Sequence, residues 1–184
     1  MTFEPSASSR DSHQSVPLID FVAYGHEAML AGRLPLDADR LTDLLNASDE
    51  VELVDVVSLG VEGDVVETDL VVVRRRELVA VKAGNPRGRP SLRKPTRQSA
   101  VLAGAGRHVM HGYIHHRPGA DPMIDVGRRA PMIPLTEATI AYQTPSGWRR
   151  DRASTLIVNR DTADWLRPAK EDDLARLVAQ TSAA

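Results

Sequence analysis

The sequence predicts a mainly β protein (α+β) made of two tandem small β-barrel-like modules, plus a C-terminal helix. Each module is expected to have about four strands and one short helix. Valine-rich runs such as VELVDVV and DLVVV favour strands, and aromatic residues make up only 4% of the chain. Turn residues bound these runs. The second half of the chain also repeats the first at an offset of about 80 to 85 residues, which is typical of a duplicated domain.

The repeat is visible in matched residues and matched runs. Gly32 matches Gly112, Asp43 matches Asp125, and Asp55 matches Glu137. The run ELVDVV matches IPLTEAT, and LVVVRRRELVAVKA matches TLIVNRDTADWLRPA. The offset between matched residues increases from about 80 to about 85 along the chain, as small loop insertions in the second copy would produce.

The elements follow the same order in each copy. In the first copy, the sequence predicts strands at 27–36, 51–61, 65–74 and 77–82, and a helix in DRLTDLLNAS. In the second, it predicts strands at 108–116, 132–143, 152–159 and 163–167, with a helix shortened or lost at Pro122 and Gly127. The run PLIDFVAY adds a possible extra strand before the first copy. Four short strands hide their edges when they close into a small barrel.

Five segments result from this organisation. They are a disordered tail (1–17), a first module (18–82), a basic Pro/Gly/Arg linker (83–107), a second module (108–168), and a C-terminal helix and tail (169–184).

The motifs RLTDLLN and ELVDV resemble those of an uncharacterised family of small β-rich bacterial proteins. The resemblance covers about two-thirds of the chain with motifs of low specificity. It implies a small-barrel fold and no activity.

Composition narrows the function classes. The chain has no cysteine, which excludes disulfides and thiolate zinc sites and fits the cytoplasm. No apolar run is long enough to span a membrane, and the N-terminal MTFEPSASSRDSHQS has no signal-peptide core. A phosphate-binding loop and a G-x-S-x-G elbow are both missing, so we predict no enzyme activity and no cofactor.

Two groups of polar residues are candidates for a metal or catalytic site. Four histidines occur in HVMHGYIHH: His108, His111, His115 and His116. On a strand, His111 and His115 lie about 13 Å apart and cannot share a metal without other ligands, so we predict no metal site. The recurring acids of the two copies are expected on solvent-facing surfaces and not in a catalytic pair.

Charge is distributed unevenly along the chain. Residues 1–81 carry six Lys/Arg against sixteen Asp/Glu, whereas residues 82–120 carry eight basic residues and no acid. A block of one sign is typical of a solvated linker or of a segment that meets an anionic partner.

The pentamer PRGRP (86–90) resembles the core of the AT-hook, a short DNA-binding segment. The resemblance implies that Arg87, Gly88 and Arg89 lie in the A·T minor groove, whose floor presents only acceptors. The basic flanks are expected to contact phosphates; they are Lys82, Arg93, Lys94 and Arg97. The flanks depart from the usual pattern at Asn85 and Ser91, where basic residues are expected.

The sequence therefore predicts a non-enzymatic protein that contacts A·T-rich DNA through its linker. The alternative is a protein-interaction or assembly module, in which β edges and the C-terminal helix bind a protein partner or a second copy.

Overall fold

The computed structural model describes residues 16–84, 95–170 and 172–181. The elements of the first half are β1 (Leu18–Gly25), β2 (Ala28–Pro35), α1 (Leu41–Ala47), β3 (Glu50–Gly60), β4 (Val65–Arg74), the 3₁₀ turn η1 (Arg75–Glu77) and β5 (Leu78–Lys82). Those of the second half are β6 (Arg97–Ala105), β7 (His108–His116), α2 (Pro122–Gly127), β8 (Met132–Thr144), β9 (Gly147–Asn159), η3 (Arg160–Thr162), β10 (Trp165–Pro168) and α3 (Asp173–Thr181). Most of the predicted N-terminal tail, residues 1–15, lies outside the described residues.

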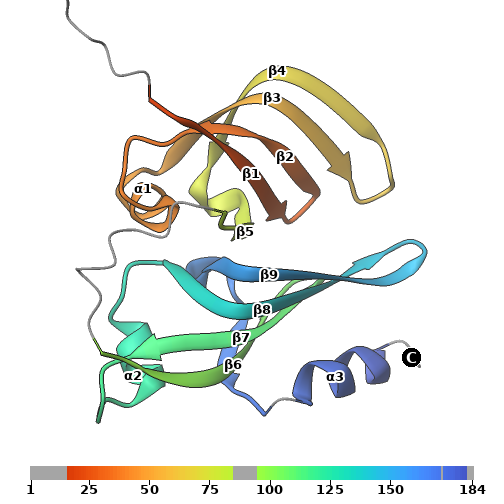
Figure 1. Ribbon diagram of the computed structural model, residues 1–184. Helices are drawn as coiled ribbons and strands as arrows, with labels where there is room; N and C mark the ends of the chain where they lie inside the picture. Colours follow the sequence, from red (N-terminus) through yellow and green to blue (C-terminus); the bar gives the residue numbers. More distant parts are fainter. Residues whose placement is uncertain (1–15, 85–94, 171, 182–184) are drawn as a thin grey trace, which may run out of the picture.

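All the strands belong to one antiparallel ten-stranded sheet, in the order β10-β6-β7-β8-β9-β5-β1-β2-β3-β4. The sheet is not closed, because β10 and β4 each have only one strand neighbour among the described residues. It curls so that β1 to β4 lie above β6 to β9 in Figure 1. The prediction of two tandem barrel-like modules of about four strands is therefore wrong.

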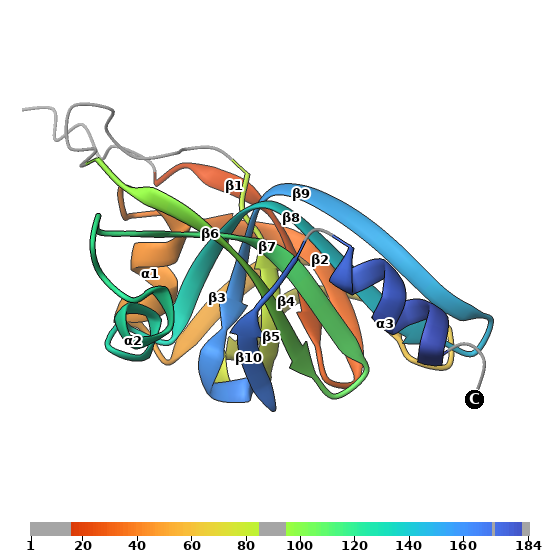
Figure 2. The same ribbon diagram turned by 90° about the horizontal axis from the view of Figure 1, so that it is seen from below.

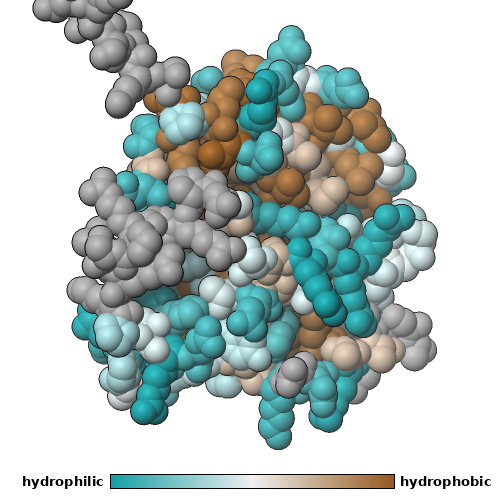
Figure 3. All heavy atoms as spheres, viewed as in Figure 1, coloured by the Kyte–Doolittle hydropathy of each residue, from teal (hydrophilic) through white to brown (hydrophobic). Residues whose placement is uncertain are grey.

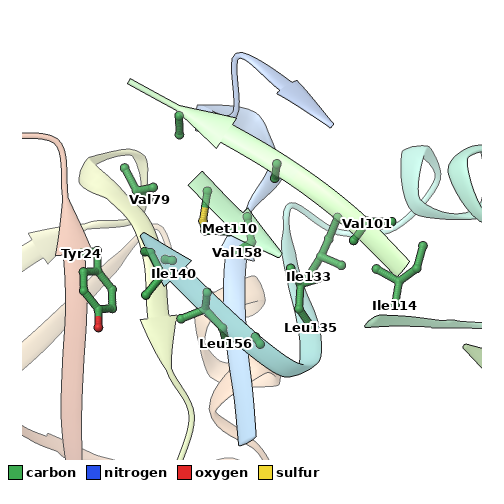
Figure 4. Close-up of a cluster of buried hydrophobic side chains, with 14 of the residues drawn as sticks. Tyr24, Val79, Val101, Met110, Ile114, Ile133, Leu135, Ile140, Leu156 and Val158 are labelled. Carbon is green, nitrogen blue, oxygen red and sulfur yellow. The ribbon is translucent and has the colours of Figure 1, made fainter. Parts of the chain in front are cut away.

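The two halves form one sheet because each of the two main hydrophobic cores contains residues from both halves. β5 of the first half pairs with β9 of the second, with Ala80 opposite Val158. The core built mainly by β6 to β9 also contains Tyr24 of β1 and residues of β5 (Figure 4). The core around α1 contains Met132 and Ile157 from the second half. Joining the halves buries apolar surface that two separate modules would leave in water.

Two asparagines tie the halves together through backbone groups. The Asn46 amide donates to the carbonyl of Met132 and accepts from its N–H, both at 3.0 Å. Asn159, which is buried, donates to the carbonyls of Arg75 at 2.9 Å and Leu78 at 3.0 Å. Each contact satisfies polar groups that the junction removes from water.

Strand β6 lies within the predicted linker 83–107 and is a correction to it. Its sequence, RQSAVLAGA, is rich in Ala and Gly, which have low strand propensity. Pairing with β7 and β10 on its two sides overrides this propensity. Gly104 is required there, because a Cβ atom at this position would collide with the indole of Trp165.

The strand order is the same in the two halves. It is β5-β1-β2-β3-β4 in the first and β10-β6-β7-β8-β9 in the second. Both halves also have a bulge at matched positions, where Asp55 (φ 52°) and Glu137 (φ 50°) adopt the left-handed conformation. A duplicated ancestor would produce this agreement, although the duplication itself stays a prediction.

The helices end in a matched way. Arg75 donates to the carbonyls of Leu45, Asn46 and Ser48 at the end of α1. Arg160 donates to those of Val126, Gly127 and Arg129 at the end of α2. Such contacts satisfy carbonyls that have no partner within the helix. Figure 2 shows α1 and α2 at one end of the sheet and α3 beside β7.

Pro122 begins α2 and does not interrupt it. The Asp121 side chain accepts hydrogen bonds from the N–H groups of Met123 and Ile124, and Pro122 occupies the first turn. Proline is favoured at this position because its missing N–H has no partner there in any helix.

Candidate interaction surface

The outer part of the β3–β4 hairpin exposes apolar side chains. We call this set the β4 surface. It comprises Val57, Leu59, Val61, Val65, Val66, Leu70 and Val72, which are 36% to 59% exposed. Figure 3 shows hydrophobic spheres gathered where Figure 1 draws this hairpin. A contiguous apolar patch on a folded protein is typical of an interaction site.

The exposure follows from the place of β4 at the edge of the sheet. Its sequence, VVETDLVVVR, has apolar residues at both odd and even positions, which is typical of a strand covered on both faces. Val73 at its end is buried against the α1 core, but Val65, Val66 and Leu70 are more than half exposed.

The matched strand β9 shows how such a strand is buried elsewhere in this chain. Leu156, Ile157 and Val158 are at most 4% exposed, because β8 and β5 pair with the two edges of β9. The repeat matches Ile157 to Val72, which is 55% exposed. The difference is that β4 has a strand neighbour, β3, on one side only among the described residues.

Charge on β4 is divided between its ends. The N-terminal part and the turn before it carry exposed acids, namely Glu62, Asp64, Glu67 and Asp69. Within the described residues, no ion pair reaches Glu67 or Asp69. Arginines lie at the C-terminal end: Arg74 pairs with Glu50 at 3.2 Å, and Arg75 and Arg76 follow in η1. The strand therefore has an acidic and a basic end.

A polar cluster at the junction of the halves is a second candidate. The Tyr24 hydroxyl donates to Asp151 Oδ2 at 2.6 Å, and Lys82 Nζ lies 3.4 Å from the same oxygen. Burial, followed by the hydrogen bond to Asp151, raises the pKa of the Tyr24 phenol. A phenol with a raised pKa keeps its proton at neutral pH, so it cannot act as a base.

His108 lies beside this cluster. Its ring centroid is 6.3 Å from those of both Tyr24 and Tyr142. Burial, and then the charge of Arg107, lowers the pKa of the His108 imidazole to about 4. The adjoining cavity measures only about 40 Å³, which is room for a few waters. The cluster therefore joins the two halves through a hydrogen bond, an ion pair and ring contacts.

A polar groove of about 640 Å³ lies near η1 and η3. Its basic lining is engaged within the chain: Arg74 pairs with Glu50, Arg75 with Asp49 and Arg76 with Glu77. Three carboxylates of the same lining, those of Asp49, Glu50 and Asp161, balance the three arginines, so the groove has no excess positive charge to attract an anion. We therefore assign the groove no ligand.

The predicted DNA-binding residues lie mostly outside the described residues. These are Arg87, Gly88, Arg89, Arg93 and Lys94. Lys82 ends β5, where its Nζ atom lies 3.4 Å from Asp151 and 5.9 Å from the centroid of the Tyr24 ring. Arg97 begins β6 and is exposed.

Two of the histidines and two of the recurring acids have side-chain partners within the chain. His115 contacts Thr136 at 2.9 Å and His116 contacts Ser99 at 2.9 Å. Asp55 pairs with Arg33, and Asp125 with Arg129. In the part of the chain that the structure describes, no group of three or more His, Asp or Glu side chains could hold a metal ion. Nor is any helix in this part long and apolar enough to cross a membrane.

Comparison of the chain with protein-family models, with curated proteins and with solved structures found no match. The candidate site therefore depends on the geometry of this molecule alone.

Proposed function

We propose that this protein is an interaction module that binds an extended protein segment along β4. The observation that carries the proposal is the edge position of a strand with apolar side chains on both faces. Strand addition uses free backbone N–H and C=O groups for affinity and alternate side chains for specificity. A reducing compartment such as the cytoplasm, which the lack of cysteine fits, belongs to the same proposal.

The chemistry of the β4 surface describes the partner segment. Valine and leucine select apolar side chains at alternate positions of the added strand. Exposed acids at and before the N-terminal end of the strand, namely Glu62, Asp64 and Glu67, favour basic residues near that end of the added segment and disfavour acids there. The partner is therefore an extended segment that combines β-branched and basic residues.

A random peptide library displayed on phage tests this proposal. The protein is immobilised so sparsely that two copies cannot meet. We expect selection of extended apolar peptides with basic residues. The double variant Leu70→Lys/Val72→Lys is expected to lose binding at least tenfold, because lysines on an edge strand oppose strand addition.

The matched control is Ile124→Lys. Ile124 is 57% exposed on α2, so this variant places a lysine at a similarly exposed apolar position away from β4. Circular dichroism checks that all variants keep the fold. The proposal fails if no peptide is enriched, or if the selected peptides bind the Leu70→Lys/Val72→Lys variant as well as the parent.

DNA binding through PRGRP is the second candidate, and the observation that favours it is the Arg-Gly-Arg sequence between two prolines. We expect the double variant Arg87→Ala/Arg89→Ala to lose its preference for A·T-rich over G·C-rich duplex in a mobility-shift assay. The reason is that these two guanidinium groups would reach the minor-groove floor.

The matched control for this assay is Arg93→Ala/Lys94→Ala, which is expected to weaken binding to all duplexes alike, since phosphate contacts carry no sequence information. Binding is also expected to fall steeply with salt. Equal binding of A·T-rich duplex by the parent and by Arg87→Ala/Arg89→Ala would reduce PRGRP to a linker.

A further inference from the structure

We infer that the segment bound along β4 is β4 of a second copy of this chain, so that two molecules join antiparallel about a two-fold axis. The inference rests on the proposed function and names its partner. A closed dimer about a two-fold axis is the commonest form of self-association among soluble proteins. It would join the two sheets into one continuous sheet and leave no β4 edge in water.

Charge complementarity is the first argument. The segment from Glu62 to Asp69 is acidic, and the segment from Arg74 to Arg76 is basic. Antiparallel pairing of β4 with itself places the acidic end of each strand beside the basic end of the other. Parallel pairing would place like charges together, which is unfavourable.

The side chains also select a register. Suppose that the two-fold axis of the dimer is perpendicular to the joined sheet. Side chains on one face of β4 then lie next to side chains on the same face of β4 of the second copy. With Leu70 on the axis, each Leu70 lies opposite the other, and Val72 lies opposite Thr68 of the second copy. Arg74 then lies opposite Val66 and diagonal to Asp64 of the second copy, within reach of its carboxylate.

Neighbouring registers are less favourable. With Asp69 on the axis, two carboxylates face each other directly. With Thr68 on the axis, Glu67 of each copy faces Asp69 of the other. With Val71 on the axis, fewer residues overlap, because β4 ends at Arg74. The register centred on Leu70 combines a long overlap with no directly opposed acids.

The other edge of the sheet is a poorer partner. β10 has only four residues, Trp165–Pro168, and ends in a proline that has no N–H to donate. Its Trp165 side chain lies against Gly104 within the same molecule. Pairing of β4 with β10 would also leave open ends and would build a filament instead of a closed dimer.

The first measurement is the mass of the full chain by sedimentation over a range of concentrations. We expect the parent and the Ile124→Lys variant to reach twice the monomer mass, and Leu70→Lys/Val72→Lys to remain monomeric. A parent that is monomeric throughout, or that grows into larger polymers, overturns the inference. So does a dimer that persists in Leu70→Lys/Val72→Lys.

A cross-linking measurement tests the register, and it is clean because the chain has no cysteine of its own. In Leu70→Cys, the two introduced thiols lie opposite each other with Cα atoms about 5 Å apart, which suits a disulfide. In the matched control Val66→Cys, on the same strand, the two thiols lie about 26 Å apart. We expect oxidation to give a covalent dimer of Leu70→Cys only.

The outcomes separate the inference from the proposed function. Equal cross-linking of both cysteine variants overturns the proposed register. A monomeric parent that still selects peptides through β4 overturns self-pairing and leaves strand addition standing. A monomeric parent that selects no peptides overturns both.

Discussion

Replacing Asn159 with leucine is expected to lower the free energy of unfolding by about 3 kcal/mol. Asn159 is 2% exposed, and its side chain donates to the carbonyls of Arg75 and Leu78 and accepts from the N–H of Asp161 at 3.2 Å. Leucine leaves buried backbone groups without partners, and each such group costs about 1 to 3 kcal/mol. Urea denaturation followed by circular dichroism measures the effect.

The matched control for Asn159 is Thr162→Val. The Thr162 hydroxyl lies in the same turn and donates to the carbonyls of Asn159 at 3.0 Å and Leu78 at 3.3 Å. Because Asn159 Nδ2 still serves the Leu78 carbonyl, the control is expected to cost only about 1 kcal/mol. A loss below about 1 kcal/mol in Asn159→Leu would show that the halves do not depend on this junction.

This junction is the part of the fold that the sequence predicted least well. The pairing of β5 with β9 joins residues that are far apart in the chain. Local sequence patterns predict that a segment is a strand, but they do not specify which distant strand will pair with it. One signal was present: LVAVK has no alternation of apolar and polar residues before its lysine, which is typical of a central strand. A strand that is buried on both faces does not fit the wall of a small closed barrel, because the outer face of that wall meets water.

Local patterns did predict most of the individual strands. The expected bounds at 65–74 and 108–116 agree with β4 and β7, because turn glycines shortly before each strand, Gly63 and Gly106, are local signals of where it begins. The strand predicted at 152–159 begins too late, because β9 begins at Gly147 and includes GWRRD. It is extended because each residue pairs with β8, from Gly147 opposite Thr144 onward.

The candidate surface could be predicted only in part. The sequence of β4, with apolar residues at odd and even positions, is typical of a strand covered on both faces. Only the strand order shows that no second strand covers it within the described residues. Val66, Leu70 and Val72 are apolar but more than half exposed. This exposure is the reason for which we propose that another strand adds to β4.

The last expected result is a loss of stability in acid caused by His108. Its folded-state pKa is lowered to about 4 from 6.5, since burial disfavours the imidazolium and Arg107 adds a second positive charge nearby. Between these two pH values the unfolded chain binds a proton that the folded chain does not. The contribution of His108 is therefore fully present above pH 6.5 and is lost as the pH falls towards 4.

The size of this loss is about 3 kcal/mol, because each pKa unit corresponds to about 1.4 kcal/mol. The free energy of unfolding is measured as a function of pH for the parent and for His108→Gln. The difference between the two proteins isolates the contribution of His108, because the carboxylates that titrate in the same pH range are present in both. Near neutral pH the parent is expected to be the more stable, because its neutral imidazole packs against Tyr24 and Tyr142. Near pH 4 the advantage should shrink or reverse, because glutamine has no proton to bind. If urea denaturation shows the two proteins losing stability in parallel between neutral pH and pH 4, His108 is not held neutral by its burial at the junction.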